Sequence, residues 1–172
     1  SKEKSGGKKV SYQNPIAIPV NGGWRYGYGN QFYVKLVEQY LVASAKFDDE
    51  TVQKIMDEAL KYQGYPYVFG GSNPQTSFDC SGIVQWCFAK VGINLPRTAQ
   101  AQYDVTKHLS LAEAKPGDLI FFHSTYSTSD YVTHVGIYVG NNRMYHAGDP
   151  IGYTDLTESY WQAHLIGAGR VK

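Results

Sequence analysis

The sequence lacks a long apolar run and an excess of charge of either sign. No hydrophobic stretch approaches the roughly 20 residues that a membrane-spanning helix needs, and none resembles a signal-peptide core, so we expect a soluble chain without a membrane span. Export is not excluded, because a signal can be removed. The 16 Lys and Arg side chains nearly balance the 15 Asp and Glu side chains. A nucleic-acid-binding domain normally carries clustered basic residues, so we expect no nucleic-acid partner.

Cysteine is scarce, since the 172 residues include only two, Cys80 and Cys87. Both fall on one predicted helix, and seven residues of helix span roughly 10 Å along the axis. A disulfide needs Cα atoms within about 7 Å of each other. We therefore expect two free thiols, each of which needs its own explanation.

Hydrophobic residues are plentiful and follow two different periods. They make up 42% of the chain, which is enough for a compact core. Helical spacing dominates before residue 117 and strand alternation after it, which predicts an α+β domain with helices packed on one face of an antiparallel sheet. The predicted helices start near Asn30 and cover residues 48–60, 79–91 and 99–106, and the predicted strands cover 118–122, 134–139, 143–147 and, more weakly, 165–171.

Two segments show little periodicity. Residues 1–29 are rich in Gly, Asn and Pro and are predicted to be irregular, and residues 72–78 are predicted to form a polar loop. We place the domain boundary near residue 47. Residues 1–47 then form an N-terminal extension or linker, and residues 48–172 form the main domain.

Cys80 is a candidate nucleophile because it begins a predicted helix. Unpaired backbone N–H groups and the helix dipole favour an anion there, and such positions are among those that lower the pKa of a cysteine. Gly82 removes bulk beside the sulfur, so that another backbone can approach closely. The alternative is a small buried hydrophobic residue. Cys87 lies mid-helix between Trp86 and Phe88 and is expected in the core.

A nucleophilic cysteine needs a base, usually histidine, and often a third group that orients it. His134 and His146 lie on neighbouring predicted strands, whereas the other three histidines have surface or structural interpretations. A two-residue loop alone would place the two rings on opposite faces, and an odd-length loop or a bulge would place them on one face. We predict such an irregularity near residues 140–143. On spacing alone, two unrelated histidines remain an equal alternative.

Six short motifs, in order and near the expected spacing, resemble the NlpC/P60 family of papain-like cell-wall peptidases over about residues 52–172. Phe69 departs from the family pattern, which often has Trp there, and we expect altered packing of the glycine turn without loss of activity. The motifs are Tyr67-Val68-Phe69-Gly70-Gly71, Phe78-Asp79-Cys80-Ser81-Gly82, Leu95-Pro96-Arg97, Pro116-Gly117-Asp118-Leu119, His134-Val135-Gly136-Ile137-Tyr138-Val139-Gly140 and Tyr145-His146-Ala147.

The resemblance implies a role for each matching polar residue. It implies Cys80 as nucleophile, His134 as general base and acid, and His146 as the residue that orients His134. It further implies that the Tyr67 hydroxyl and the Cys80 backbone N–H stabilise the oxyanion, a role in which fixed donors are effective. Asp79 and Ser81 would help to hold the free amine or the backbone of the wall peptide, and helix capping is the alternative, which Asp79 could perform at the same time.

The function implied by the resemblance is hydrolysis of the D-γ-glutamyl–diamino acid amide bond of peptidoglycan stem peptides through a Cys80 thioester. This needs no cofactor and no metal, and it places the protein outside the cell or in the wall. Three alternatives stay open. These are an acyltransferase or amidase with the same Cys-His-His site, a zinc site formed by Cys80, His134 and His146, and a non-catalytic wall-binding module.

The N-terminal residues show a second resemblance. The segment from Gly22 to Leu41 is similar to the end of lysozyme-like wall hydrolase domains. Our hypothesis is that the chain is a monomeric peptidase part tethered to such a domain, with residues 1–47 as its remnant. A plain extension that packs on the peptidase is an equal alternative.

Overall fold

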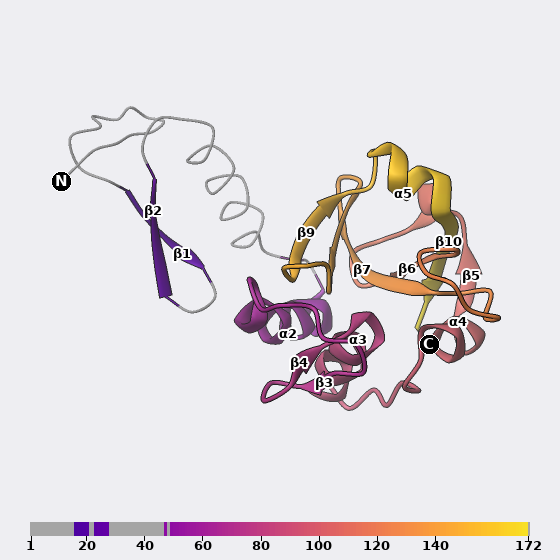
Figure 1. Ribbon diagram of the computed structural model, residues 1–172, viewed down its shortest axis with the longest axis horizontal. Helices are drawn as coiled ribbons and strands as arrows, with labels where there is room; N and C mark the ends of the chain where they lie inside the picture. Colours follow the sequence, from indigo (N-terminus) through magenta and orange to yellow (C-terminus); the bar gives the residue numbers. More distant parts are fainter. Residues whose placement is uncertain (1–15, 21–22, 28–46, 48, 172) are drawn as a thin grey trace. The chain divides into compact units, whose positions relative to one another are not determined.

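The computed structural model describes residues 16–20, 23–27, 47 and 49–171, and it divides the chain into two compact units, Ser1–Lys46 and Phe47–Lys172 (Figure 1). In the first unit, strand β1 (Ile16–Val20) pairs antiparallel with β2 (Gly23–Gly27). The prediction that residues 1–29 are irregular is therefore wrong for these ten positions. Pro19 is compatible with this pairing, because in a two-stranded sheet both strands are edges, where proline is tolerated. The helix predicted from Asn30 lies outside the described residues.

The helices of the second unit confirm those predicted between residues 48 and 106. Asp49 caps the first helix, because its carboxylate accepts hydrogen bonds from the N–H groups of Thr51 (2.8 Å) and Val52 (3.2 Å). A short C-terminal helix was not predicted. The helices are α2 (Glu50–Ala59), α3 (Cys80–Ala89), α4 (Ala99–Asp104) and α5 (Ser159–His164), with 3₁₀ turns at Leu60–Tyr62 and Leu111–Glu113.

Six strands form one antiparallel sheet in the order β5-β10-β6-β7-β8-β9. The four predicted strands are present, and two further strands, which hold few apolar residues, were not predicted. A separate two-stranded hairpin corrects the prediction of a polar loop at residues 72–78. The sheet strands are β5 (Lys107–Leu109), β6 (Leu119–Phe122), β7 (His134–Gly140), β8 (Arg143–His146), β9 (Gly152–Asp155) and β10 (Leu165–Arg170), and the hairpin strands are β3 (Ser72–Asn73) and β4 (Ser77–Phe78).

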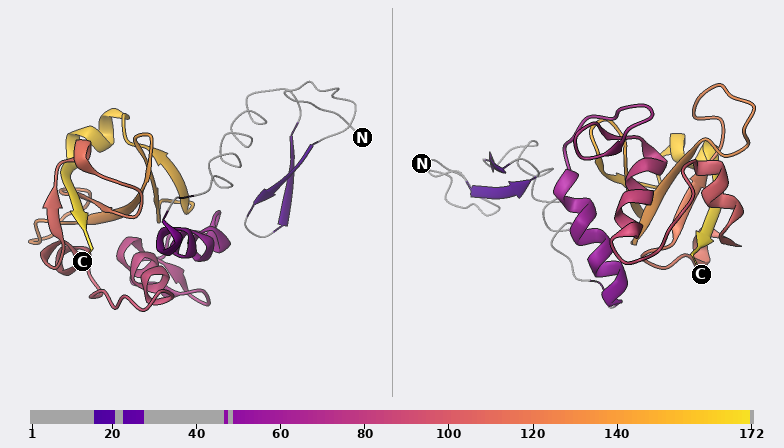
Figure 2. Two further views of the ribbon diagram at one scale, coloured as in Figure 1. Left: turned by 180° about the vertical axis from the view of Figure 1, so that it is seen from behind. Right: turned by 90° about the horizontal axis from the view of Figure 1, so that it is seen from below.

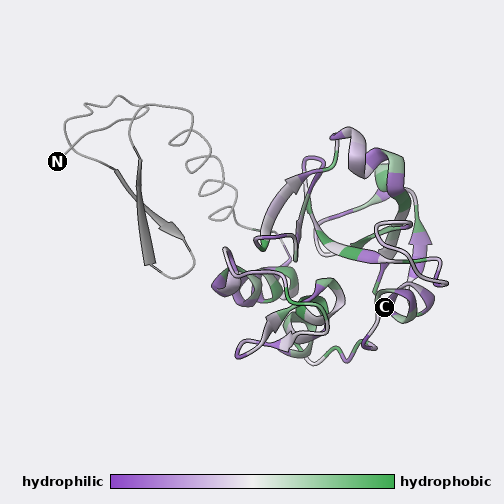
Figure 3. Cartoon of the chain, in the orientation of Figure 1, coloured by the Kyte–Doolittle hydropathy of each residue, from purple (hydrophilic) through white to green (hydrophobic). Residues whose placement is uncertain are grey.

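Hydrophobic side chains cover both faces of the sheet. Helices α2 and α3 lie next to each other on one side of it in both views of Figure 2, as predicted for the N-terminal helices. Their core includes Val84 of α3 and Val135 and Ile137 of β7. On the other face, Phe122 and Met144 pack with Trp161 of α5. The hydrophobic stretches of α3 and the central strands are visible in Figure 3. The start of β7 is thereby fixed between two packed layers.

The β7–β8 hairpin carries the predicted irregularity. Its turn has two residues, Asn141 and Asn142, both with positive φ (53° and 56°). The register then shifts between Tyr138 and Gly140, which marks a β-bulge. The extra residue in β7 shifts the pairing by one position. His146 of β8 therefore lies on the same face of the sheet as His134 and Gly136 of β7. The hairpin therefore brings His134 and His146 to one face, as predicted.

Candidate active site

Cys80 is the first residue of α3, and its sulfur lies against the start of β7. The Sγ atom is 4.0 Å from the carbonyl oxygen of Thr133, and the N–H of Val135 donates to it. The thiol therefore contacts the peptide groups on both sides of His134. Cys80 is only 6% exposed, so this contact is largely shielded from water.

Close backbone packing fixes the start of α3. A Cβ atom on Gly82 would overlap the carbonyl oxygen of Gly71, which confirms that Gly82 lets another backbone approach. The same carbonyl accepts a hydrogen bond from the N–H of Asp79 (2.9 Å). The glycine turn that follows Tyr67 is thus held against the helix end that presents the thiol.

The two predicted histidines form a hydrogen-bonded pair. His134 Nε2 lies 2.8 Å from His146 Nδ1, and His146 Nε2 lies 2.8 Å from the hydroxyl of Thr154 on β9. Both imidazoles are buried. Because Nε2 of His134 faces His146, Nδ1 is the ring nitrogen left to exchange a proton with a thiol. The chain of polar groups is therefore His134, His146, Thr154.

Small and aromatic neighbours set the space around the pair. A Cβ atom on Gly136 would lie 2.6 Å from Met144 Sδ and 3.1 Å from His146 Cβ, so Gly136 makes room for these side chains. Helix α3 packs on the opposite face of the sheet, against Val135 and Ile137. The Trp161 ring lies 5.4 Å from the His134 ring and 5.2 Å from the His146 ring, between centroids.

Burial controls the protonation of the site. It raises the pKa of the Cys80 thiol to about 11, although the N–H groups of Val135 and Ser81 act in the opposite sense. A lowered pKa, as the helix start alone suggests, is therefore not found. Burial also lowers the pKa of His134 to about 4, and it lowers that of His146 well below the ordinary value, with help from the neighbouring His134 charge. The resting pair is a neutral thiol beside a neutral imidazole.

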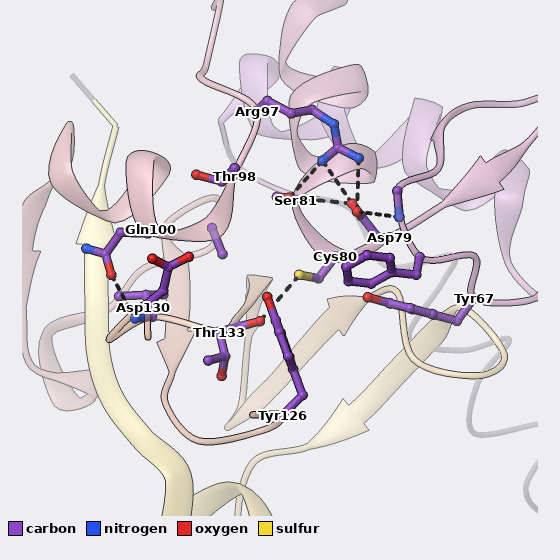
Figure 4. A pocket seen from close by; sticks show the side chains of 14 residues that line it. Tyr67, Asp79, Cys80, Ser81, Arg97, Thr98, Gln100, Tyr126, Asp130 and Thr133 are labelled. Atoms are coloured by element: carbon purple, nitrogen blue, oxygen red, sulfur yellow. Dashed lines mark hydrogen bonds and ion pairs between the residues drawn. The ribbon is translucent and has the colours of Figure 1, made fainter. Parts of the chain in front are cut away.

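Asp79 and Ser81 belong to a second polar network, which is anchored by Arg97. The guanidinium donates to both carboxylate oxygens of Asp79 (3.0 and 2.9 Å) and to the Ser81 hydroxyl (2.9 Å), and it also reaches the Gly71 carbonyl (3.2 Å) (Figure 4). Asp79 also caps α3 through the N–H of Gly82 (2.8 Å). The predicted capping role of Asp79 is thus confirmed.

A cavity of about 340 Å³ opens beside Cys80. The hydroxyls of Tyr67 and Tyr126 are turned towards the cysteine in Figure 4. Burial, followed by the charges of Cys80 and Asp79, raises the pKa of Tyr67, so its hydroxyl keeps its proton. At the rim, Phe69 is 77% exposed and its ring meets that of Tyr126 at 6.3 Å. The cavity wall also includes Asp79, Ser81, Arg97, Gln100, Asp130 and Thr133.

Other predicted features also have clear positions. Cys80 and Cys87 are both free thiols, as predicted, and Cys87 is fully buried in the core. Within the described residues, no group of three or more His, Cys, Asp or Glu side chains is arranged to hold a metal ion. In the same part of the chain, no helix is both long and apolar enough to cross a membrane.

Several site residues were not predicted from the sequence, among them Arg97, Thr154 and Trp161. Arg97 stands in a motif that carries the family resemblance, so its signal was present but no role was assigned to it. Thr154 and Trp161 gave no signal, because a short strand and a short helix that were not predicted bring them to the histidines.

The fold and the site define a papain-like α+β protein, in which a cysteine at a helix start meets a histidine pair on the neighbouring hairpin. The model of the NlpC/P60 family matches residues 64–170, and the chain belongs to this family. A second family model, described as lysozyme-like, matches residues 1–41. The chain therefore joins a lysozyme-like segment to an NlpC/P60 segment.

Individual relatives agree with this assignment. The chain is 47% identical over 183 residues to the bifunctional muramidase/DL-endopeptidase CwlT of Bacillus subtilis, a match that covers 99% of the chain and 54% of that protein. It is 42% identical over 119 residues to the gamma-DL-glutamyl hydrolase of the same organism, covering 67% of the chain and 28% of that protein. The chain thus spans about half or less of these relatives.

A solved structure matches almost the whole chain. It is a crystal structure described as similar to a lipoprotein of the NLP/P60 family, from Staphylococcus aureus subsp. aureus Mu50. Its sequence is 70% identical, its TM-score is 0.71, and the match covers 99% of this chain and 58% of that one. The likeness therefore extends through both units of the chain.

Proposed function

We propose that this chain is a cysteine endopeptidase that hydrolyses the D-γ-glutamyl–diamino acid amide bond of peptidoglycan stem peptides. The observation that carries the proposal is the position of the Cys80 sulfur, against the peptide groups that flank His134, at the edge of a cavity. The names of the two Bacillus relatives, a DL-endopeptidase and a gamma-DL-glutamyl hydrolase, support the bond type.

The reaction begins from the neutral pair. Nδ1 of His134 takes the proton of the Cys80 thiol as the sulfur attacks the γ-carbonyl carbon of D-glutamate. The imidazolium then gives this proton to the leaving amine, and the C–N bond breaks to leave a thioester. His134 next removes a proton from water, the resulting hydroxide attacks the thioester, and the thiolate takes the proton back.

His146 and Tyr67 assist these steps. His146 accepts a hydrogen bond from Nε2 of His134 (2.8 Å) and holds the ring with Nδ1 available. The protonated Tyr67 hydroxyl and the backbone N–H of Cys80 donate to the oxyanion that forms on the carbonyl. Neither role needs a cofactor.

Asp79 and Ser81 line the cavity on the side of Tyr67, and we assign them to the wall that holds the peptide backbone. The carboxylate of Asp79 is engaged by several donors, so its part is to shape this wall and to fix Arg97.

The proposed setting is the cell wall or the outside of the cell, where peptidoglycan is found. We further propose that residues 1–47 are the end of a lysozyme-like domain and that residues 48–172 form the peptidase domain, acting as a monomer. The lysozyme-like match to residues 1–41 supports this division.

The test is digestion of purified peptidoglycan, followed by mass spectrometry of the released muropeptides. We expect products with a new free amine on the diamino acid, and we expect none from the Cys80→Ala variant. Products cut at another bond would contradict the proposed specificity. A fully active Cys80→Ala variant with a native circular dichroism spectrum would contradict the cysteine mechanism, and transfer of the acyl group to an added amine would indicate an acyltransferase.

A further inference from the structure

In the cavity wall beside Tyr67, the positive charge of Arg97 cancels the negative charge of Asp79. The Asp79 carboxylate accepts hydrogen bonds from both terminal nitrogens of Arg97 (3.0 and 2.9 Å) and from the backbone N–H groups of Gly70 (3.0 Å) and Gly82 (2.8 Å). The Ser81 hydroxyl adds a longer fifth contact (3.4 Å). A carboxylate offers about four lone-pair positions, so these donors saturate it. A substrate cation would have to compete with all of them for the Asp79 oxygens.

Asp130 differs from Asp79 in this respect. It lies on the cavity wall across from Tyr67 and Asp79, beside Gln100 (Figure 4). Among the residues that the structure describes, no donor or cation contacts its carboxylate. Because Arg97 and Asp79 neutralise each other, Asp130 gives the lined cavity its net negative charge. Its charge also reaches the cavity interior, since it adds to burial and to Cys80 in raising the pKa of Tyr126.

The loop that carries Asp130 is held in place without using the carboxylate. The N–H of Val132 donates to the Gln100 side chain (2.8 Å), and the Thr125 and Thr133 hydroxyls lie 2.6 Å apart. The N–H of Asp130 itself donates to the Thr128 hydroxyl (3.3 Å). The carboxylate is thus exposed at the cavity and is engaged by no donor of the described residues, so it can accept hydrogen bonds from a compact cationic ligand.

We propose that Asp130 binds an ammonium group of the wall peptide and that it is a specificity-determining residue of this site. The inference rests on the proposed function. A stem peptide offers two such groups, the α-ammonium at its N-terminus and the side-chain ammonium of the diamino acid. Both are strongly hydrated point charges with three N–H donors, so one open carboxylate suits either of them.

The test uses the whole chain and three synthetic peptides with the sequence L-Ala-D-γ-Glu-L-Lys. One peptide has both amines free, one is acetylated at the N-terminus, and one is acetylated at the lysine side chain. For the wild type, we expect acetylation of one of the amines to lower kcat/KM about two- to fivefold, as exposed ion pairs typically contribute. The sensitive peptide identifies which amine Asp130 binds.

The Asp130→Asn variant decides the assignment. We expect it to cleave the free peptide more slowly than the wild type and to lose the penalty for acetylation, whereas Asp130→Glu keeps part of it. Asp57→Asn is the matched control, because Asp57 is an exposed carboxylate on α2 outside the cavity. Higher ionic strength should reduce the wild-type penalty.

Two results would overturn the inference while leaving the proposed function intact. The first is a wild type that cleaves all three peptides equally well, and the second is an Asp130→Asn variant that keeps the full wild-type penalty. If the wild type cleaves none of the three peptides but releases other muropeptides from whole peptidoglycan, the proposed bond is wrong and this inference fails with it.

Discussion

His134 Nε2 and His146 Nδ1 lie 2.8 Å apart although the two residues stand on different strands of one hairpin. A regular two-residue turn would place these rings on opposite faces of the sheet. The bulge between Tyr138 and Gly140 shifts the register by one residue and brings them together. The histidine pair therefore depends on a backbone irregularity as much as on the two side chains.

Thr154 should be a positioning residue for this pair. To accept a proton on Nδ1, His134 must carry its hydrogen on Nε2 and donate it to Nδ1 of His146. The hydrogen of His146 then lies on its Nε2, and the Thr154 hydroxyl, 2.8 Å away, is the acceptor that it needs. A buried N–H without an acceptor costs about 1–3 kcal/mol, which corresponds to about 5- to 150-fold in rate. We expect Thr154→Val to lower kcat by that factor with little change in KM, and Thr154→Ser to stay near the wild-type rate.

A nitrogen NMR measurement distinguishes this role from a purely structural one. In the wild type, the His146 proton should reside on Nε2, and in Thr154→Val the two tautomers should mix. A Thr154→Val variant with wild-type kcat would remove Thr154 from the mechanism.

The pH dependence of activity should follow the neutral resting pair. Burial lowers the pKa of His134 to about 4 and raises that of Cys80 to about 11. Between these values both groups keep the protonation state that the reaction starts from. We expect kcat/KM on a stem peptide to be flat from about pH 5 to about pH 9 and to fall on the acid side as His134 becomes protonated. A sharp loss already near pH 6.5 would mean that His134 titrates as an exposed histidine.

Alkylation provides an independent measurement of the thiol. The thiolate is the reactive form, so the rate of iodoacetamide reaction at Cys80 should keep rising with pH beyond 9. Cys87 should react more slowly at every pH, because it is fully buried and its pKa is raised further. Peptide mapping by mass spectrometry separates the two sites. A rate that is constant above pH 7 would indicate a pre-formed thiolate instead.

The buried histidines should make the fold sensitive to acid. In the unfolded chain, His134 takes up a proton near its ordinary pKa of 6.5, but in the folded chain it does so only near 4. Protons therefore favour the unfolded state as the pH falls from 6.5 to 4, and His134 alone should cost up to about 3 kcal/mol of stability over this window. Urea unfolding at several pH values measures the loss. His134→Gln should show a weaker pH dependence, and an unchanged slope would contradict the assignment.

Arg97 should be required for the shape of the cavity. Its planar guanidinium bonds both oxygens of Asp79, and lysine cannot reproduce this geometry. We expect Arg97→Lys and Arg97→Gln to lower the free energy of unfolding by about 1–3 kcal/mol, because the Asp79 carboxylate loses its partner. Arg97→Gln should lose more activity than Lys54→Gln, which makes the same kind of change at an exposed residue of α2. Full activity and stability in Arg97→Gln would contradict this role.

The local elements could be predicted from the sequence because their signals are local. The apolar stripe after Asp49 and its capping side chain define α2, and the short apolar run of residues 119–122 defines β6. The bulge near residue 140 was also predictable, but only on the assumption that His134 and His146 act together and so lie on one face of the sheet. Strands β5 (KHL) and β9 (GYTD) give no strand signal, because each short segment holds only one large apolar or aromatic residue.

The remaining features of the site depend on contacts between distant segments. The upward shift of the Cys80 pKa follows from burial, and a position at a helix start does not reveal how deeply the thiol is buried. The face on which α3 packs and the arrival of Thr154 and Trp161 depend on strand order and on a late helix turn. Likewise, the sequence places Asp79 beside Cys80 but does not reveal that Arg97 bonds both oxygens of its carboxylate.

The neutral, 6% exposed thiol of Cys80 has a consequence for chemical durability. Oxidants such as peroxide attack thiolates, and sulfenic acid forms fastest on cysteines that are both ionised and accessible. A thiol that ionises only as it attacks substrate offers neither property in the resting protein. This nucleophile should therefore survive in an oxidising medium without a partner that reduces it.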